Sequence, residues 1–251
     1  MCGIAGALIY DPVQARLEHM VAAVGASAAR GVDSFGVIRW SFSTGFRRHI
    51  HRGPTCSDWL GEIGGPAREE ATIYLHTSRA EPTTEWRHEK ADADIPPFID
   101  QGIAVAHNGI IANDAELASQ HGLERCSEID TAIVPSLVAH LGVWRAIAAL
   151  KGGSALAILD SRRESLVLCR NFMPLVLTWE PGIVCFASEA GFFPRAGQPF
   201  RSYQSWELAP FTGLELSARG YRGPIGWGCV PIQPENDDWE PFPALRWRTD
   251  D

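Results

Sequence analysis

The sequence predicts an α+β domain built in layers. Short apolar runs bounded by turn residues occur in both halves of the 251-residue chain, with helical periodicity between them. Hydrophobic residues make up 45% and charged residues 21% of the chain, as in soluble globular proteins. No repeat or linker divides it. We therefore expect one domain over residues 1–251, with its core at about 2–220 and an irregular Trp- and Pro-rich tail over 221–251.

The first third of the chain predicts a strand, a helix and three more strands. Small and apolar residues at 2–10 are typical of a buried strand, and the stretch 14–30 has helical periodicity. Alternation over 35–52 predicts two paired strands that turn at 43–45. A further strand is expected at 72–80, before a segment rich in residues that break helices and strands.

The rest of the chain predicts one strand, two helices and a run of short strands. The apolar stretch 102–107 ends at Asn108-Gly109, and helical segments follow at about 113–121 and 129–141. Four short runs separated by turn residues then resemble an antiparallel sheet. With two further candidates, the predicted strands after the helices cover 154–160, 165–171, 174–179, 182–188, 202–210 and 213–218.

Composition excludes several classes of function. The net charge is −8 and no run of Lys and Arg occurs, which argues against nucleic acid as the principal ligand. No stretch approaches the ~18 consecutive apolar residues of a membrane span, and the start lacks a signal-peptide layout. The six cysteines are scattered, which favours a reduced, cytoplasmic protein with neither a disulfide framework nor structural zinc.

Cys2 raises the first question of function. In one interpretation it is a small apolar residue of a buried strand. In the other, removal of Met1 leaves a thiol and a free α-amino group on the same residue, so that nucleophile and base form a unit. Their reference pKa values, about 8.5 and about 8, are close enough for proton exchange near neutrality.

Four motifs, taken in order, point to the second interpretation. MCGIAG at the start, RGVDSFG at 30–36, VAHNGIIAN at 105–113 and SEIDTAIV at 127–134 together resemble the glutaminase domain of class II glutamine amidotransferases. The stretches 152–160, 168–177, 186–193 and 206–220 resemble later strands of that family, the last as a closing strand pair. The resemblance implies the N-terminal-nucleophile (Ntn) hydrolase fold, a four-layer αββα sandwich with two antiparallel sheets. It implies no metal or organic cofactor.

The resemblance also assigns catalytic roles. Cys2 becomes the nucleophile that attacks the side-chain amide of glutamine, forms a γ-glutamyl thioester and releases ammonia, with its own α-amino group as base. Asn108 and Gly109 become the donors that stabilise the oxyanion. A structural alternative exists, because Asn-Gly between apolar runs is a strong hairpin signal. The two interpretations are compatible, because a tight turn at Asn108-Gly109 would orient the N–H donors toward the oxyanion.

Substrate binding is assigned to Asp130, Arg79 and His107. Asp130 resembles the carboxylate that receives the α-ammonium group of glutamine, although the S-x-x-D pattern that it ends is also typical of a helix cap. His107 adjoins Asn108, and a core histidine is the alternative for it, as it is for His76.

Arg79 departs from the family pattern, in which His-Thr-Arg carries the arginine that holds the α-carboxylate. Here the order is His76-Thr77-Ser78-Arg79, with one residue intervening. An inserted residue turns a strand side chain to the other face unless a bulge absorbs it. We therefore expect either a bulge near Ser78 or a rebuilt clamp, with a solvent-facing arginine as the alternative.

The expected activity is that of a stand-alone glutaminase. Glutamine would be the substrate, and a separate synthetase or transferase would accept the ammonia, because no adenylating loop, P-loop or dinucleotide fingerprint occurs in the chain. The stretch 79–85 resembles glutaminases linked to 7-deazaguanine amidation, which indicates a modified purine as acceptor. Two alternatives remain: an amidohydrolase of a γ-glutamyl or related amide conjugate, and a catalytically idle regulatory or interaction protein on the same fold.

Overall fold

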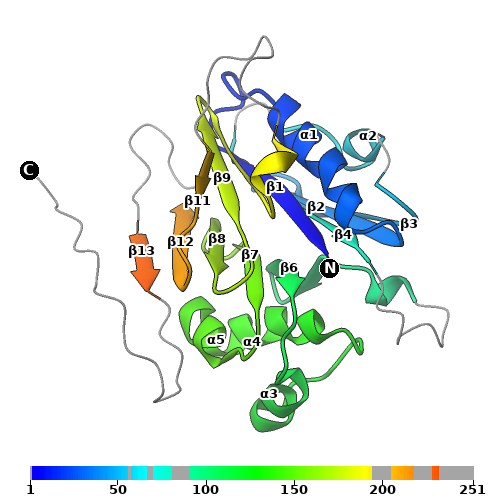
Figure 1. Ribbon diagram of the computed structural model, residues 1–251, viewed down its shortest axis with the longest axis vertical. Coiled ribbons are helices and arrows are strands. Elements are labelled where there is room, and N and C mark those ends of the chain that lie inside the picture. Colours follow the sequence, from blue (N-terminus) through cyan, green and yellow to red (C-terminus); the bar gives the residue numbers. More distant parts are fainter. Residues whose placement is uncertain are drawn as a thin grey trace, which may run out of the picture.

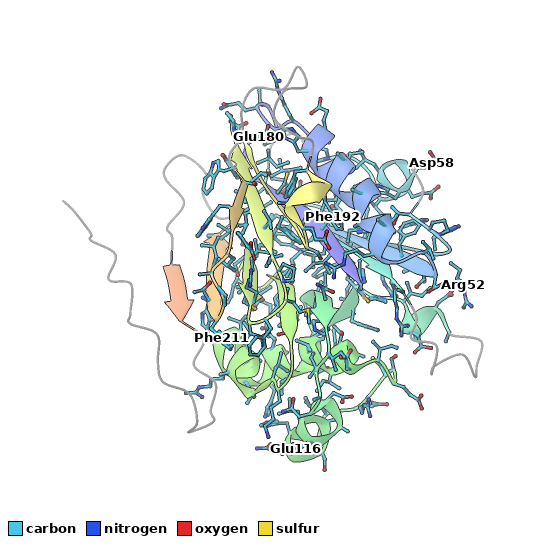
Figure 2. All side chains as sticks on the ribbon, in the orientation of Figure 1. Arg52, Asp58, Glu116, Glu180, Phe192 and Phe211 are labelled. Atoms are coloured by element: carbon cyan, nitrogen blue, oxygen red, sulfur yellow. The ribbon has the colours of Figure 1, made fainter. Side chains whose placement is uncertain are left out.

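Two antiparallel sheets lie face to face, and helices cover their outer faces (Figure 1). This arrangement comes from a computed structural model. It describes residues 2–55, 58–66, 70–80, 91–193, 205–217 and 228–231. Side chains from both sheets fill the space between them (Figure 2).

The first sheet has seven strands in the order β11-β9-β10-β1-β4-β2-β3. Their bounds are β1 Gly3–Ile9, β2 Ser34–Ser41, β3 Gly45–Arg52, β4 Thr72–Arg79, β9 Val176–Glu180, β10 Ile183–Ala187 and β11 Ser205–Glu207. Strand β1 is central and pairs with β4 on one side and β10 on the other. The N-terminal end of β1 is therefore held on both sides, where Ile4 N–H donates to Ser188 Oγ at 2.9 Å.

The second sheet has six strands in the order β13-β12-β8-β7-β6-β5. Their bounds are β5 Phe98–Asp100, β6 Ile103–Gly109, β7 Ser154–Asp160, β8 Ser165–Arg170, β12 Thr212–Ser217 and β13 Gly228–Pro231. Strand β6 contacts β1 and β4 of the first sheet. The start of β1 and the end of β6 thus meet in the same region, where Figure 1 places the N-terminus beside β6.

Helices complete a four-layer sandwich. Helices α1 (Glu18–Ser27) and α2 (Trp59–Ile63) bury Met20, Val24 and Trp59 against the outer face of the first sheet. On the second sheet the cover consists of α3 Asp114–His121, the 3-10 turn η4 Asp130–Ile133, α4 Val134–Leu141 and α5 Val143–Ala149. The predicted αββα architecture is confirmed. None of the described helices is long and apolar enough to cross a membrane.

Several sequence expectations need correction. The first helix begins at Glu18 rather than at 14, because Asp11 accepts backbone N–H groups of Val13 and Gln14 and holds a turn there. Helix α5 was not predicted, since seven residues show too little periodicity. The four short runs do not form one sheet: β7 and β8 lie in the second sheet, β9 and β10 in the first.

The end of the chain also differs. Strands β11 and β12 do not pair with each other: β11 pairs with β9 and β12 with β8, so the two lie in different sheets. Part of the expected irregular tail is regular, because β13 pairs with β12. The rest of 218–251 lies outside the described residues.

Register decides which side chains face the space between the sheets. In β1 the even positions Ile4 and Leu8 point there, and in β4 the odd positions Ile73 and Leu75 do. The alternate residues of both strands pack under α1 and α2. We call the side between the sheets the inner face and the helix-covered side the outer face.

Candidate functional site

Cys2 lies at the point where the two sheets meet. Cys2 immediately precedes β1. Gly3 of β1 pairs with Ser78 of β4, and the same register extended by one residue places Cys2 beside Arg79. Cys2 is partly exposed as a residue and lies directly before β1, which begins at Gly3. Burial of the thiol raises its pKa; the Arg79 guanidinium and a hydrogen bond from the Ala80 backbone oppose this rise, and the Asp130 carboxylate adds to it. The thiol is thus within electrostatic reach of both predicted substrate-binding charges.

Arg79 occupies the inner face. Strand β4 pairs with β1 and β2 without a skipped residue through Thr77, Ser78 and Arg79, so the expected bulge is absent from this strand. Because Leu75 and Arg79 are four positions apart on a regular strand, both point to the inner face, with Cys2. The residue order His76-Thr77-Ser78-Arg79 is thus accommodated in β4 without a bulge.

The guanidinium of Arg79 is held rather than solvated. The residue is 5% exposed, which contradicts the solvent-facing alternative. Its Nη1 donates to the Asp94 carbonyl oxygen at 3.3 Å. Gly31 lies against its backbone: a Cβ at this glycine would come within 2.4 Å of the Arg79 carbonyl carbon. A larger residue at 31 would push the end of β4 away.

Asn108 and Gly109 are the last residues of β6, not a hairpin turn. They pair with Ala155 and Ser154 of β7, a strand that follows only after three helices. Asn108 is at an even position, which is the inner face of β6 because Ala104 and Ala106 point there. It is fully buried, and within the part of the chain that the structure describes neither amide atom has a hydrogen-bond partner.

Gly109 is required by close packing at the end of β6. Its φ is 141°, and a Cβ on it would lie 1.9 Å from the Gly153 carbonyl oxygen. Only glycine fits both the dihedral angle and the space. The end of β6 therefore lies directly against the start of β7, where Ile110 N–H also donates to the Gly153 carbonyl at 2.8 Å.

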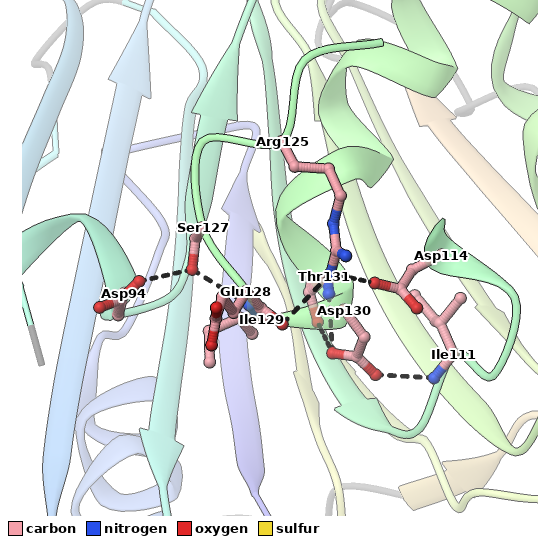
Figure 3. A network of polar contacts seen from close by, with 9 residues as sticks. All are labelled: Asp94, Ile111, Asp114, Arg125, Ser127, Glu128, Ile129, Asp130 and Thr131. Atoms are coloured by element: carbon pink, nitrogen blue, oxygen red, sulfur yellow. Dashed lines mark hydrogen bonds and ion pairs between the residues drawn. The ribbon is translucent and has the colours of Figure 1, made fainter. Parts of the chain in front are cut away.

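Asp130 starts η4 and faces the end of β6 (Figure 3). Its Oδ2 accepts the Ile111 N–H at 2.7 Å, and its Oδ1 accepts the N–H of Thr131, also at 2.7 Å. A carboxylate has about four lone-pair sites, so further donors can bind. The helix-cap box expected from S-x-x-D does not form: the residue before Asp130 occupies the cap position without a side-chain bond.

His107 lies behind Asp130 and not with Cys2. It is at an odd position of β6, whose odd residues pack under the helices, and its Nδ1 lies 2.7 Å from Thr131 Oγ1. Burial lowers its pKa, and the Asp130 carboxylate opposes this. His76 is also an outer-face residue, and complete burial lowers its pKa to about 3. Both imidazoles are neutral groups that hold neighbouring hydroxyls.

Sequence reasoning missed two inner-face hydroxyls. Thr77 Oγ1 and Ser34 Oγ are buried, and among the described residues neither has a hydrogen-bond partner. Thr77 is two residues before Arg79 on the same face, and Ser34 pairs with Arg79 across β2 and β4. The alternation along 72–79 could have identified Thr77. Within the same described part, no group of three or more His, Cys, Asp or Glu side chains could hold a metal ion.

Comparison with known proteins places these residues in context. Residues 85–194 match a family described as "Glutamine amidotransferase domain". The chain is 33% identical over 231 residues to a 7-cyano-7-deazaguanine synthase of Saccharolobus solfataricus, covering 87% of this chain and 49% of the relative. It is 32% identical to a glutamine–fructose-6-phosphate aminotransferase of Halobacterium salinarum, covering 86% of this chain and 36% of that protein. The chain thus spans about half or less of these relatives' length.

Solved structures support the fold. The glutamine phosphoribosylpyrophosphate amidotransferase of B. subtilis matches with a TM-score of 0.65 at 18% identity, over 92% of this chain and 49% of that one. A structure titled as the allosteric regulatory enzyme of purine biosynthesis matches with a TM-score of 0.68 at 17% identity, with the same coverages.

Proposed function

We propose that this chain, part of which matches a glutamine amidotransferase domain, is a class II glutamine amidotransferase that hydrolyses glutamine at Cys2 and supplies the ammonia to a separate acceptor enzyme. One observation carries the proposal: four segments far apart in the sequence contribute Cys2, Arg79, Asn108 and Asp130 to one region. Of these, Cys2 and Arg79 come from the first sheet and Asn108 from the second. A nucleophile, a cation, an anion and an unpaired amide are the groups needed to bind and attack an amino-acid amide.

In the first step the Cys2 thiol passes its proton to the α-amino group, which Met1 removal would free, and Sγ attacks the side-chain carbonyl carbon. Asn108 Nδ2, with the Gly109 N–H, stabilises the oxyanion as it forms. The α-ammonium returns the proton to the amide nitrogen, the C–N bond breaks, and ammonia leaves with the thioester in place. Water, deprotonated by the amine, then cleaves the thioester to glutamate and restores the thiol.

Binding relies on the two charges beside the thiol. Arg79 holds the α-carboxylate and Asp130 receives the α-ammonium, each through charge-assisted hydrogen bonds worth roughly 1.5–3 kcal/mol. The orientation of the guanidinium by the Asp94 carbonyl supports the first role. The lone pairs left on the Asp130 carboxylate support the second. His107 acts through Thr131, by keeping η4 in place.

The acceptor is proposed from the relatives. Matches at 30–33% identity carry the name 7-cyano-7-deazaguanine synthase, and they cover most of this chain. We therefore propose that the ammonia is used to amidate or convert a 7-deazapurine, on catalytic machinery other than the residues described above.

The test uses 6-diazo-5-oxo-L-norleucine, a glutamine-like electrophile. We expect one adduct, mapped by mass spectrometry to Cys2 in protein that has lost Met1, with glutamine protecting against it and glutamate released in its absence. Cys126 is an exposed free thiol and serves as the internal control for unspecific alkylation. Unlabelled Cys2 without glutamate release would contradict the proposal. Faster hydrolysis of a γ-glutamyl conjugate than of glutamine would support the amidohydrolase instead.

A further inference from the structure

A chain of hydrogen bonds connects the two charged residues of the proposed glutamine site. Arg79 Nη1 donates to the backbone carbonyl of Asp94 at 3.3 Å. The Asp94 carboxylate accepts the hydroxyl of Ser127 at 2.6 Å (Figure 3). Ser127 Oγ in turn accepts the Ile129 N–H at 3.1 Å, and Asp130 is the next residue.

Arg79 and Asp130 come from different layers of the fold. The arginine ends β4 in the first sheet, whereas Asp130 starts η4, which covers the second. Asp94 closes a short 3-10 turn (Asp92–Asp94), and Ser127 lies in the loop before η4. The Asp94–Ser127 hydrogen bond joins these two segments. It is the middle link in the chain of hydrogen bonds between Arg79 and Asp130.

The distance matters because the α-carboxylate and the α-ammonium of an amino acid are attached to the same carbon. A site that holds both must keep its two partners within about 0.5 Å of the productive geometry. We propose that Asp94 and Ser127 are positioning residues that set the separation of Arg79 and Asp130 and thereby select an α-amino acid amide over a simple amide. This inference rests on the proposed function.

The surroundings of Ser127 favour this role over a helix cap. Its hydroxyl is directed to Asp94, not to the first turn of a helix, and the residue is only 8% exposed. The next carbonyl, that of Glu128, accepts from Arg125 Nη2 at 3.3 Å, and Arg125 also pairs with Asp114 (Figure 3). The loop before Asp130 is therefore held at two consecutive residues, and Ser127 is its connection to the arginine side.

The experiment compares Ser127→Ala with the wild-type chain in two measurements: the KM for glutamine, and the Ki of glutaramate, which has the same amide and carboxylate but no α-ammonium. Loss of one partly buried hydrogen bond to a charged group corresponds to about a tenfold effect. We expect KM for glutamine to rise about tenfold with kcat within about twofold, and the Ki of glutaramate to change little. Ser127→Thr keeps the hydroxyl and should restore the wild-type KM.

Ser136→Ala is the matched control. Ser136 Oγ donates to Asp100 Oδ2 at 2.6 Å, a bond of the same length and type between α4 and β5. Its removal should leave both constants unchanged. Asp94→Ala removes the carboxylate that accepts the Ser127 hydroxyl. Because both substitutions break the same hydrogen bond, the KM of the double variant should equal that of Ser127→Ala alone.

Two outcomes overturn the inference separately from the proposed function. If the wild-type chain releases glutamate and Ser127→Ala keeps its KM, the pair does not position the site. The same holds if KM and Ki rise equally, because a general loss of structure would do this. If the wild-type chain releases no glutamate from glutamine, the proposed function fails and this inference fails with it.

Discussion

The two faces of strand β4 carry polar residues in opposite states. On the outer face His76 and Ser78 form a closed cluster with Ser27 and Thr55, in which every side chain has a hydrogen-bond partner at 2.9–3.3 Å. On the inner face, Thr77 Oγ1 has no such partner within the described ranges. The same strand thus stabilises the fold on one side and leaves the Thr77 hydroxyl without a described partner on the other.

This difference indicates where a ligand binds. Buried polar groups in folded proteins are nearly always paired, and a buried group left unpaired costs about 1–3 kcal/mol. Asn108 and Thr77 have this cost, and both face the space that contains Cys2 and Arg79. The outer-face cluster has no such cost and needs no ligand. We expect substitutions on the inner face to impair catalysis and those on the outer face to impair stability.

Cys2→Ala is expected to have the largest effect. Without the sulfur no thioester can form, so glutamate release should fall by at least about 10³-fold, the scale of losing a catalytic nucleophile. The melting temperature should change by less than about 2 °C, because Cys2, a partly exposed residue ahead of β1, belongs to none of the described core clusters. A coupled glutamate assay and a thermal melt measure the two quantities. Wild-type turnover in this variant would disprove the mechanism.

Asn108→Ala should lower kcat by about 10²- to 10³-fold, the range found for loss of one oxyanion donor. KM should stay within a few fold, because the donor acts on the transition state. Stability should not fall by much, since no hydrogen bond within the described part is lost. If unfolding by urea showed a loss of several kcal/mol with kcat unchanged, the comparison between the two faces would be wrong.

His76→Gln tests the outer face. The pKa of His76 is lowered to about 3, so between pH 6.5 and pH 3 the unfolded state binds a proton that the folded state does not. Stability should therefore fall with decreasing pH in this window, by up to about 1.4 kcal/mol per pH unit. The variant should be less stable at pH 7 but show a flatter dependence, with KM unchanged. Urea unfolding at several pH values checks this; an unchanged slope would contradict it.

The smallest expected effect is on the acidity of Cys2. The Arg79 charge lowers the pKa of the thiol and the Asp130 charge raises it. Arg79→Met should therefore shift the pH midpoint of iodoacetamide labelling upward, and Asp130→Asn should shift it downward. Shifts in the same direction for both variants would mean that the two charges do not act on the thiol directly.

Prediction from sequence succeeded where the signal is local. The strand pair over 35–52 and the strand at 72–80 follow from alternation, and both are confirmed with small changes of bounds. The sheet to which a strand belongs does not follow, because β7 to β10 show the same short apolar pattern while two lie in each sheet. Sheet membership depends on connections and packing over long distances, which no local pattern records.

Asn108-Gly109 shows the same limit within the site. Two adjacent residues with strong turn preference made a hairpin the structural alternative, yet they pair with β7 and form the end of a strand that packs against Gly153. Tertiary contacts outweigh a local preference of this size. The face that Arg79 occupies also depends on strand register, which the residue order alone left open.

By itself, the sequence predicted the class of fold, and its motifs, through their resemblance to a known family, predicted Cys2 as the nucleophile and the residue types that would bind and activate an amide. Only the tertiary structure decided that Arg79 lies on the same face as Cys2, that His107 lies behind Asp130, and that the Asp94–Ser127 hydrogen bond links the two charges. These relations join residues dozens of positions apart through strand register and loop contacts. Such contacts form only when the two sheets pack together.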